Sequence, residues 1–125
     1  MEKYLEWDPI SHINDLFIWN IESGANTSKI ILKQFGESSK LLEIEFIEVM
    51  SFRLTQETAR SKSSYENKSF NGFKIVEDSK YLRWLQEESF KIFDDWPLTH
   101  YLICTVDCVI DIITTKQPVM QWITE

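Results

Sequence analysis

The sequence predicts an α+β protein, with a curved antiparallel sheet of six to seven strands and one main amphipathic helix packed on one face. Two observations predict this class. Most of the chain alternates apolar and polar residues at the two-residue period of half-buried strands. One segment, residues 80–93, instead gathers its apolar residues at helical spacing. With only three Gly and three Pro in 125 residues, these patterns favour regular elements in a single domain, residues 1–125.

The longest alternating run spans residues 41–54, and we expect the rest of the chain to be organised around it. One face of this strand is apolar and the other is acidic, and the alternation is interrupted at residues 47–48, which predicts a bulge or bend. The apolar face is the expected support for the helix, so a charge at Ile44 or Phe52 should unfold the protein. The residues concerned are Leu42, Ile44 and Phe46 on the apolar face, Glu43 and Glu45 on the acidic face, and Met50, Phe52 and Leu54 beyond the bend.

The other elements follow from turn residues and changes of period along the chain. Residues 55–69 have almost no large apolar side chain, which predicts a long, mobile surface loop. Asp78 or Ser79 supplies an N-cap for the helix at 80–93, and Pro97 ends that region. The expected strands are 17–22 and 27–34 in a meander with 41–54, a short strand at 70–75, a hairpin of 99–105 with 108–114 that places Cys104 opposite Val109, and 119–124.

The charge balance narrows the class of partner. The chain has 13 Lys and Arg against 20 Asp and Glu, a net charge of −7. Residues 51–75 are the basic exception, with five Lys and Arg against two Glu. An acidic protein is a poor ligand for nucleic acid or an anionic membrane, because both require a positive face. No apolar run is long enough for a membrane helix and no signal peptide is recognisable, so we expect a cytoplasmic protein with reduced cysteines.

No residue pattern predicts an enzyme. Cys104 invites interpretation as a nucleophile, with His100 as base and Asp107 or Asp111 as the orienting acid. Four residues along a strand, however, span about 13 Å at roughly 3.3 Å per residue, whereas proton transfer needs ~3 Å. His12, His100 and the two cysteines lack zinc-ligand spacing. We therefore expect no catalytic residue, no cofactor and no metal.

The surface offers a different kind of site. Acidic groups interleaved with aromatic anchors can dock a basic protein, because charge speeds the encounter and a buried aromatic ring holds the complex. The alternative is a solvated sheet face and a helix whose Trp residues belong to the core. The candidate partner-binding residues are Glu43, Glu45 and Glu48 on the strand, and Trp84, Glu87, Glu88, Asp94 and Asp95 on the helix and after it.

Several short segments resemble a set of small uncharacterised bacterial α+β proteins. Proteins of this size and acidity are similar to immunity proteins of bacterial polymorphic toxin systems, and this resemblance implies neutralisation of a toxin by direct binding. The segments are Asp8-Pro9-Ile10-Ser11-His12, Leu42-Glu43-Ile44, Ser51-Phe52-Arg53-Leu54, Tyr81-Leu82-x-Trp84-Leu85, and Thr99-His100-Tyr101 through Asp111-Ile112-Ile113.

Three functional hypotheses follow. The leading one is a non-enzymatic, cytosolic protein of immunity type that binds a basic toxin. The second is a small-molecule-binding domain that uses the concave sheet face, lined by Trp19, Trp84 and Trp122. The third is an enzyme, which requires His100 to lie within hydrogen-bond reach of Cys104 or a carboxylate. A homodimer through the Trp-rich helix or an edge strand is a further expectation.

Overall fold

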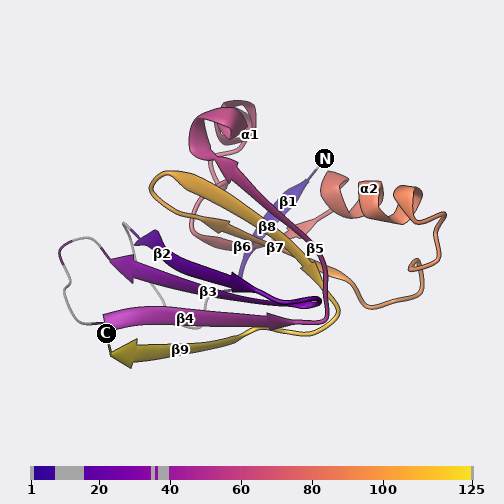
Figure 1. Ribbon diagram of the computed structural model, residues 1–125. Coiled ribbons are helices and arrows are strands. Elements are labelled where there is room, and N and C mark those ends of the chain that lie inside the picture. The colour runs from indigo at the N-terminus through magenta and orange to yellow at the C-terminus, as the bar shows by residue number, and fades with distance from the viewer. Residues whose placement is uncertain (1, 8–15, 35, 37–39, 125) are drawn as a thin grey trace.

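The computed structural model describes residues 2–7, 16–34, 36 and 40–124, and these residues form nine strands in two antiparallel sheets (Figure 1). The five-stranded sheet has the order β1-β6-β7-β8-β5, and the four-stranded sheet has the order β2-β3-β4-β9. The bounds are β1 Lys3–Glu6, β2 Leu16–Ser23, β3 Thr27–Gln34, β4 Lys40–Ile47, β5 Val49–Gln56, β6 Phe73–Glu77, β7 Thr99–Cys104, β8 Cys108–Thr114 and β9 Val119–Thr124.

The expected fold class, one curved sheet with a main helix on one face, is wrong. The run at 41–54 is indeed broken at Glu48, which has a positive φ of 53°. The two legs do not continue in one sheet, however: β4 belongs to the four-stranded sheet and β5 to the five-stranded sheet. The segment between β8 and β9 changes sheet in the same way. Each sheet therefore covers the other, and β4 needs no helix to bury its apolar face.

The core lies between the inner faces of the two sheets. Leu42, Ile44 and Phe46 of β4 are fully buried, as expected. They pack with residues of β7 and β8 from the opposite sheet, including Tyr101, Ile103, Ile110 and Ile112. Each such side chain contributes roughly 1.5–3 kcal/mol when buried. The inward prediction for the second leg is only partly correct, because Phe52 packs at the border of this core while Leu54 is 48% exposed.

Two short helices and one 3-10 turn lie on the outer face of the five-stranded sheet, away from the four-stranded sheet. The segment expected as a loop at 55–69 contains the end of β5, the 3-10 turn η1 (Glu57–Arg60) and helix α1 (Ser61–Glu66). Because these helical residues bury no side chain of their own, the sequence shows no apolar period there.

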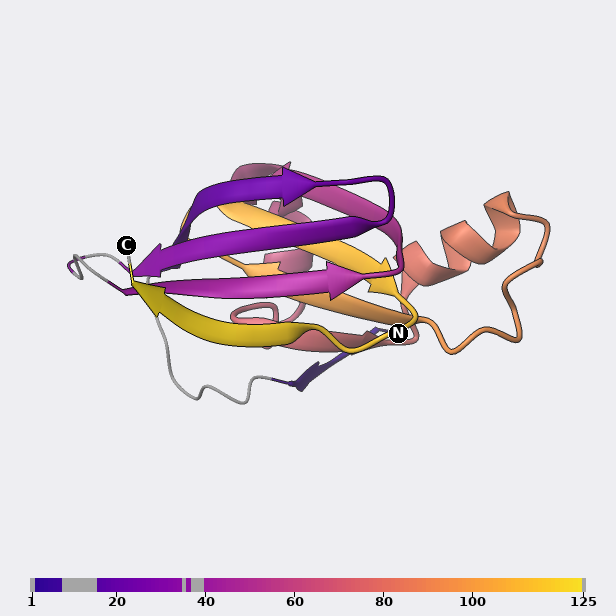
Figure 2. The same ribbon diagram turned by 60° about the horizontal axis from the view of Figure 1, so that its bottom comes forward.

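Helix α2 (Lys80–Glu88) begins at Lys80 with Ser79 as its N-cap, as predicted, but ends five residues early. The Ser89 hydroxyl donates back to the Leu85 carbonyl, and Phe90 and Lys91 adopt positive φ angles of 55° and 61°. These conformations stop the helical hydrogen-bond pattern. Tyr81 is the only buried residue of α2. Phe90 and Ile92, which follow the helix, are largely exposed and do not reach the sheet. Figure 2 shows α2 and the following loop extending beyond the edge of the sheets.

The strands expected near 17–22, 27–34, 99–105, 108–114 and 119–124 are confirmed, and Cys104 pairs with Val109 as the hairpin predicts. Strand β1 was not predicted, because four residues are too few to show a period. It pairs with β6 at the edge of the five-stranded sheet. None of the helices in the described residues combines the length and apolar character that crossing a membrane requires.

Candidate functional site

A buried polar cluster lies on the outer face of the five-stranded sheet. Its centre is Asp111 on β8, which pairs in register with Leu102 on the neighbouring strand β7. His100 is two residues from Leu102 along β7, so its side chain leaves the same face as that of Asp111. His100 Nε2 lies 2.7 Å from Asp111 Oδ1, and both residues are buried. The pairing of β7 with β8 thus brings together two side chains that are eleven residues apart in the sequence.

Two arginines converge on the second oxygen of Asp111. Arg53, which pairs with Asp111 in register from β5, approaches Oδ2 with Nε at 3.0 Å and Nη2 at 2.9 Å. Arg60 at the end of η1 places Nη1 at 2.5 Å from the same oxygen. Burial by itself raises the pKa of Asp111, but the hydrogen bond to His100 and the charges of the two arginines outweigh burial and lower it. Asp111 is therefore a buried carboxylate held ionised by its partners.

The cluster also attaches α2 to the sheet. Ser79 Oγ accepts a hydrogen bond from the Leu82 backbone N–H at 2.9 Å and lies 2.7 Å from His100 Nδ1. Because the ionised Asp111 can only accept hydrogen bonds, Nε2 of His100 carries a hydrogen, and in a neutral imidazole Nδ1 then accepts the hydrogen of the Ser79 hydroxyl. Every polar group in the series of hydrogen bonds from the Leu82 N–H through Ser79 and His100 to Asp111 then has a partner. The helix N-cap and the sheet are joined by one hydrogen-bond chain.

The hydrogen-bonded residues Ser79, His100 and Asp111 have the order of a Ser-His-Asp triad, but the serine is badly placed for nucleophilic attack. Ser79 is only 3% exposed, and its oxygen already accepts the helix N-cap hydrogen bond. A nucleophile must be reachable by substrate, and the burial of Ser79 prevents this. The structure does bring His100 to a carboxylate, which the enzyme hypothesis required, yet it places no accessible nucleophile beside it among the described residues. The arrangement fits a structural polar cluster better.

The cysteines do not join this cluster. Cys104 lies four residues from His100 on the same strand, and burial, together with the charge of Asp111, raises the pKa of its thiol to about 12. A thiol with so high a pKa is a poor nucleophile at neutral pH. The two cysteines are not bonded to each other. No group of three or more metal-ligating side chains gathers in the part of the chain that the structure describes, and His12 lies outside that part.

Of the acidic residues predicted on the strand, Glu43 and Glu45 lie on the outer face of the four-stranded sheet, and Glu48 lies at the bend between β4 and β5. Glu43 and Glu48 each have a lysine beside them. Glu43 pairs with Lys29 at 3.3 Å and accepts a hydrogen bond from Gln121. These contacts, with that from Gln121 the largest, lower the pKa of Glu43. Glu48 lies 3.6 Å from Lys116 at the bend. Glu45 is exposed. We call Glu43, Glu45 and Glu48 the acidic stripe. Its negative charge is partly neutralised by Lys29 and Lys116.

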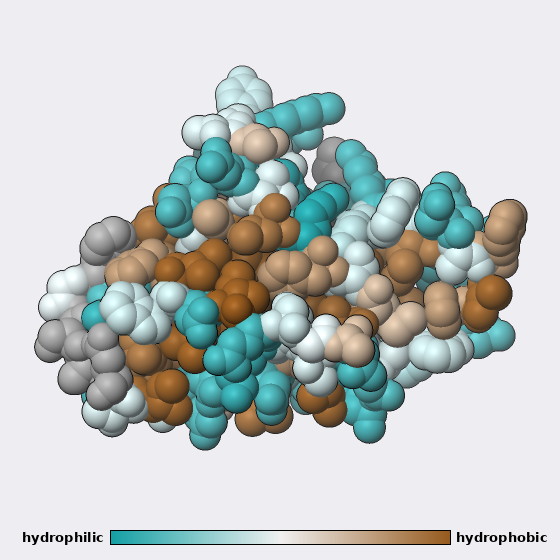
Figure 3. All heavy atoms as spheres, in the orientation of Figure 1, coloured by the Kyte–Doolittle hydropathy of each residue, from teal (hydrophilic) through white to brown (hydrophobic). Residues whose placement is uncertain are grey.

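The second group of predicted residues lies on a segment that we call the acidic arm, residues 84–96, which comprises the end of α2 and the loop after it. Trp84 and Trp96 are half exposed, Ile92 is 69% exposed and Phe90 is 91% exposed. Glu87, Glu88, Asp94 and Asp95 are also exposed. In Figure 3 the corresponding right-hand end of the molecule shows brown hydrophobic residues beside teal hydrophilic ones. The structure places these candidates together on one projecting segment.

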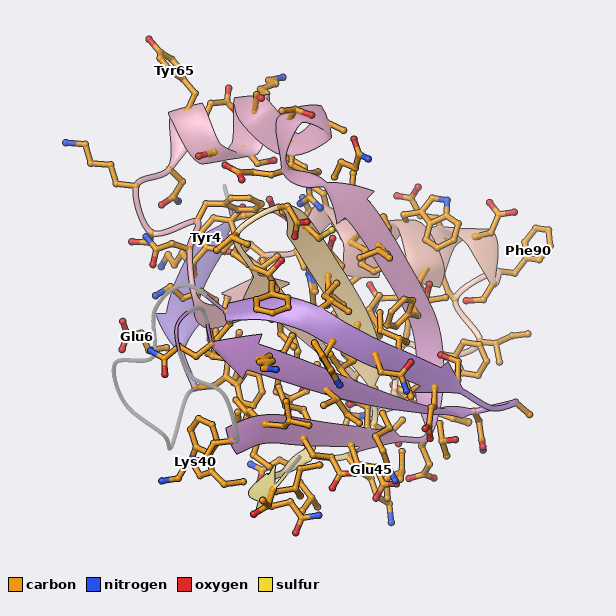
Figure 4. The ribbon with its side chains drawn as sticks, turned by 60° about the vertical axis from the view of Figure 1, so that its left-hand side comes forward. Tyr4, Glu6, Lys40, Glu45, Tyr65 and Phe90 are labelled. Atoms are coloured by element: carbon orange, nitrogen blue, oxygen red, sulfur yellow. The ribbon has the colours of Figure 1, made fainter. Side chains whose placement is uncertain are left out.

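The acidic arm and the acidic stripe are separate surfaces. β4 lies in the four-stranded sheet, whereas α2 lies against the five-stranded sheet, with the Tyr81 ring packed edge-on to His100 of β7. Figure 4 shows Phe90 at the free end of α2, pointing away from the sheets, and Glu45 at the lower edge of the view. The eight predicted residues therefore do not form one patch.

The three tryptophans expected to line a concave face are also separated. Trp19 lies on β2 with Lys33 stacked at 4.1 Å over its ring, Trp122 lies on edge strand β9, and Trp84 lies on α2. The space between the sheets is occupied by the core side chains described above. The structure thus offers no shared cavity for these three rings.

Comparison with protein-family models, with curated proteins and with solved structures finds no match. The function is therefore inferred from the residues of this chain alone. Sequence reasoning missed Arg53 and Arg60 as partners of Asp111. The signal that could have found them was the excess of Lys and Arg over Glu in residues 51–75, which the sequence analysis assigned to no site.

Proposed function

We propose that this protein is a non-enzymatic binding protein that docks a basic partner protein through the acidic arm, as an immunity protein docks its toxin. The observation that supports this most directly is the exposure of four large apolar side chains on one segment of 13 residues: Trp84, Phe90, Ile92 and Trp96. Exposed apolar groups clustered in this way are typical of interaction sites.

The charge of the arm defines the partner class. Residues 84–96 contain four acidic residues, Glu87, Glu88, Asp94 and Asp95, and one lysine, Lys91, which gives a net charge of 1 − 4 = −3. A basic surface complements this charge, accelerates association and leaves the aromatic side chains as anchors. An acidic or neutral partner would gain nothing from these carboxylates.

The arm is also ordered before any partner arrives. Successive backbone hydrogen bonds close turns along the loop, from Ile92 to the Ser89 carbonyl, from Asp94 to Lys91 and from Trp96 to Phe93. The Phe93 and Trp96 rings pack edge to face at 4.7 Å. A preformed surface loses less conformational entropy on binding than a flexible one. This supports a docking role for the arm.

A cytoplasmic location belongs to the same proposal. The two cysteines are free, which agrees with a reducing compartment. A toxin that acts inside cells would meet the protein there.

The test uses a basic protein encoded beside this gene as the candidate partner, with affinity measured by titration calorimetry. The single variants Trp84→Ala and Trp96→Ala should each weaken binding about 30-fold or more, because an anchor residue contributes about 2 kcal/mol or more. Trp19→Ala and Trp122→Ala, which remove exposed rings from the other sheet, are the matched controls and should leave affinity unchanged. Equal losses in all four variants would refute the role of the arm.

A second experiment addresses charge. The variant E87Q/E88Q/D94N/D95N should slow association and reduce its dependence on salt, while the dissociation rate changes little. Stopped-flow measurements at two ionic strengths check this.

If size-exclusion chromatography with light scattering instead shows a dimer that the Trp84→Ala and Trp96→Ala variants dissociate, the occupant of the arm is a second copy and the proposed partner is wrong.

A further inference from the structure

A groove with an excess of positive charge opens on the outer face of the five-stranded sheet, between α1 and α2. Its volume is about 610 Å³, and β1, β5, η1 and both helices contribute to its walls. A second groove of about 500 Å³ adjoins it and shares Arg53, Lys80 and Tyr81 with it. Together they form a continuous recess of the size that small ligands occupy.

The charge in this recess is opposite to that of the whole protein. Four cations line the larger groove, namely Arg53, Arg60, Lys62 and Lys80, against two carboxylates, Glu2 and Glu66. Even with the buried Asp111 counted, the balance is 4 − 3 = +1, whereas the chain carries −7. The basic excess of residues 51–75 is thus largely concentrated at one recess, where it attracts anions.

Two of these cations are fixed in position before any ligand binds. Asp111 engages Nε and Nη2 of Arg53 and Nη1 of Arg60, which leaves the other N–H groups of both guanidinium groups for a ligand. The Arg53 guanidinium also lies 4.2 Å from the centre of the Tyr81 ring. Held in this way, the arginines lose little side-chain entropy when they bind an oxyanion.

The groove already holds one carboxylate of its own chain. Glu2 accepts a hydrogen bond from the Lys80 backbone N–H at 2.8 Å and another from the Tyr4 hydroxyl at 3.0 Å. Donors at this rim are therefore oriented to receive an oxyanion. Removing the Glu2 charge should make the recess more attractive to an added anion.

The adjoining groove supplies an aromatic wall. Trp84 and Phe52 line it together with Tyr81, and Trp84 stacks on Tyr81 with ring centres 5.8 Å apart and planes at 15°. Trp84 remains half exposed, so an indole face is accessible to a planar group. Stacking on such a face tolerates many ring types.

We propose that this recess binds a small organic anion, in which a phosphate or carboxylate contacts Arg53, Arg60 and Lys80 and a planar ring stacks near Trp84. The shared chemistry is an oxyanion joined to a ring. The binding of a basic protein by the acidic arm is a separate property, although Trp84 contributes to both surfaces.

The experiment measures binding of phenyl phosphate, benzoate, inorganic phosphate and phenol to the full chain, by calorimetry at low ionic strength. Phenyl phosphate or benzoate should bind saturably, inorganic phosphate more weakly, and phenol not detectably. The stronger of the first two identifies the oxyanion as phosphate or carboxylate. Absence of saturable binding by both ring-bearing anions would overturn the proposal.

Three variants in the recess and one control outside it locate the site. Lys80→Gln should weaken the ring-bearing anion roughly tenfold, which corresponds to a lost charged hydrogen bond. Lys40→Gln on β4 is the matched control and should have no effect, and Glu2→Gln should tighten binding. Trp84→Ala should weaken phenyl phosphate by about fivefold or more and leave inorganic phosphate unchanged.

Equal affinities for the Lys80→Gln variant and the unmodified protein would place the anion elsewhere and refute the site. Lys80 lies outside the acidic arm, so its variant should still bind the basic partner. Failure of the anion site and failure of the arm are therefore distinguishable.

Discussion

At the scale of single residues, Asp111 has the most consequential position in the protein. It is fully buried and accepts hydrogen bonds from one histidine and two arginines. Its removal leaves Arg60, which is largely buried, without a counter-charge. The electrostatic balance of the recess and the attachment of η1 to the sheet both depend on this one carboxylate.

Asp111→Asn should therefore lower the free energy of unfolding by about 3 kcal/mol, the lower end of the range for breaking a buried ion pair. The lower end applies because Arg53 is 41% exposed in its side chain and water screens its charge. Urea denaturation at pH 7 measures this change. Asp107→Asn, an exposed acid in the turn between β7 and β8, is the control and should change stability by less than about 0.5 kcal/mol.

The stability contribution of Asp111 should depend on pH in a defined direction. Its pKa in the folded state is lowered, so the folded protein keeps the charge at pH values where the unfolded chain takes up a proton. The contribution is fully present above the usual Asp pKa of about 3.9 and is lost as pH falls through the lower folded value. The stability difference between the unmodified protein and Asp111→Asn should be equal at pH 7 and pH 5 and smaller at pH 3. An unchanged difference at pH 3 would contradict the lowered pKa.

At the scale of elements, α2 is attached to the sheet by few contacts near its first turn. Ser79 caps the helix and reaches His100, and Tyr81 is buried with its hydroxyl hydrogen-bonded to Ser51 of β5. Trp84 stacks on Tyr81, and the rest of the acidic arm extends beyond the edge of the sheets. The position of the arm therefore depends on the cap.

Ser79→Ala should cost about 1–3 kcal/mol of stability, because it removes the N-cap and leaves His100 Nδ1 buried without its partner. Ser79→Thr retains the hydroxyl and should recover most of this loss, and Ser64→Ala, at an exposed position of α1, serves as a control. Chemical denaturation gives the stabilities, and amide hydrogen exchange across residues 80–88 reports whether the helix opens. Unchanged exchange in Ser79→Ala would show that the cap does not hold α2.

The individual elements also show which features of the fold local sequence could predict. Period-two alternation located β2, β3, β4, β7, β8 and β9, and the Cys104 to Val109 pairing followed from hairpin geometry. The end of α2 was not predictable, because Phe90 and Lys91 adopt positive φ angles that their side chains disfavour. From the sequence, Asp111 was named as a possible partner of His100, but the other members of the cluster, which come from β5, η1 and the cap of α2, were missed. Only the pairing of distant strands brings them together.

At the scale of the whole molecule, stability depends on the layer between the two sheets. Ile44 is fully buried in that layer, whereas Leu54 on β5 is 48% exposed. Both belong to the same apolar pattern in the sequence. The structure separates them into one position that cannot accept a charge and one that can.

Ile44→Asp should abolish the cooperative thermal transition, because an unpaired carboxylate in the core costs more than the net stability of most small domains. Leu54→Asp should melt cooperatively and lose about 1 kcal/mol or less. Circular dichroism melting compares the two variants. A cooperative transition at the unmodified temperature in Ile44→Asp would refute the two-layer core.

The sequence by itself determined which residues alternate, where β4 and β5 are separated by a bend, and which strand face is apolar. These are local properties, set by side-chain period and backbone preference over a few residues. Tertiary structure alone decided that the two legs of residues 41–54 enter different sheets, that Asp111 gathers two arginines, and that residues 84–96 project with their aromatic side chains exposed. The physical reason is that an apolar face specifies burial but not the surface that covers it, and two facing sheets bury the β4 face as completely as a helix would.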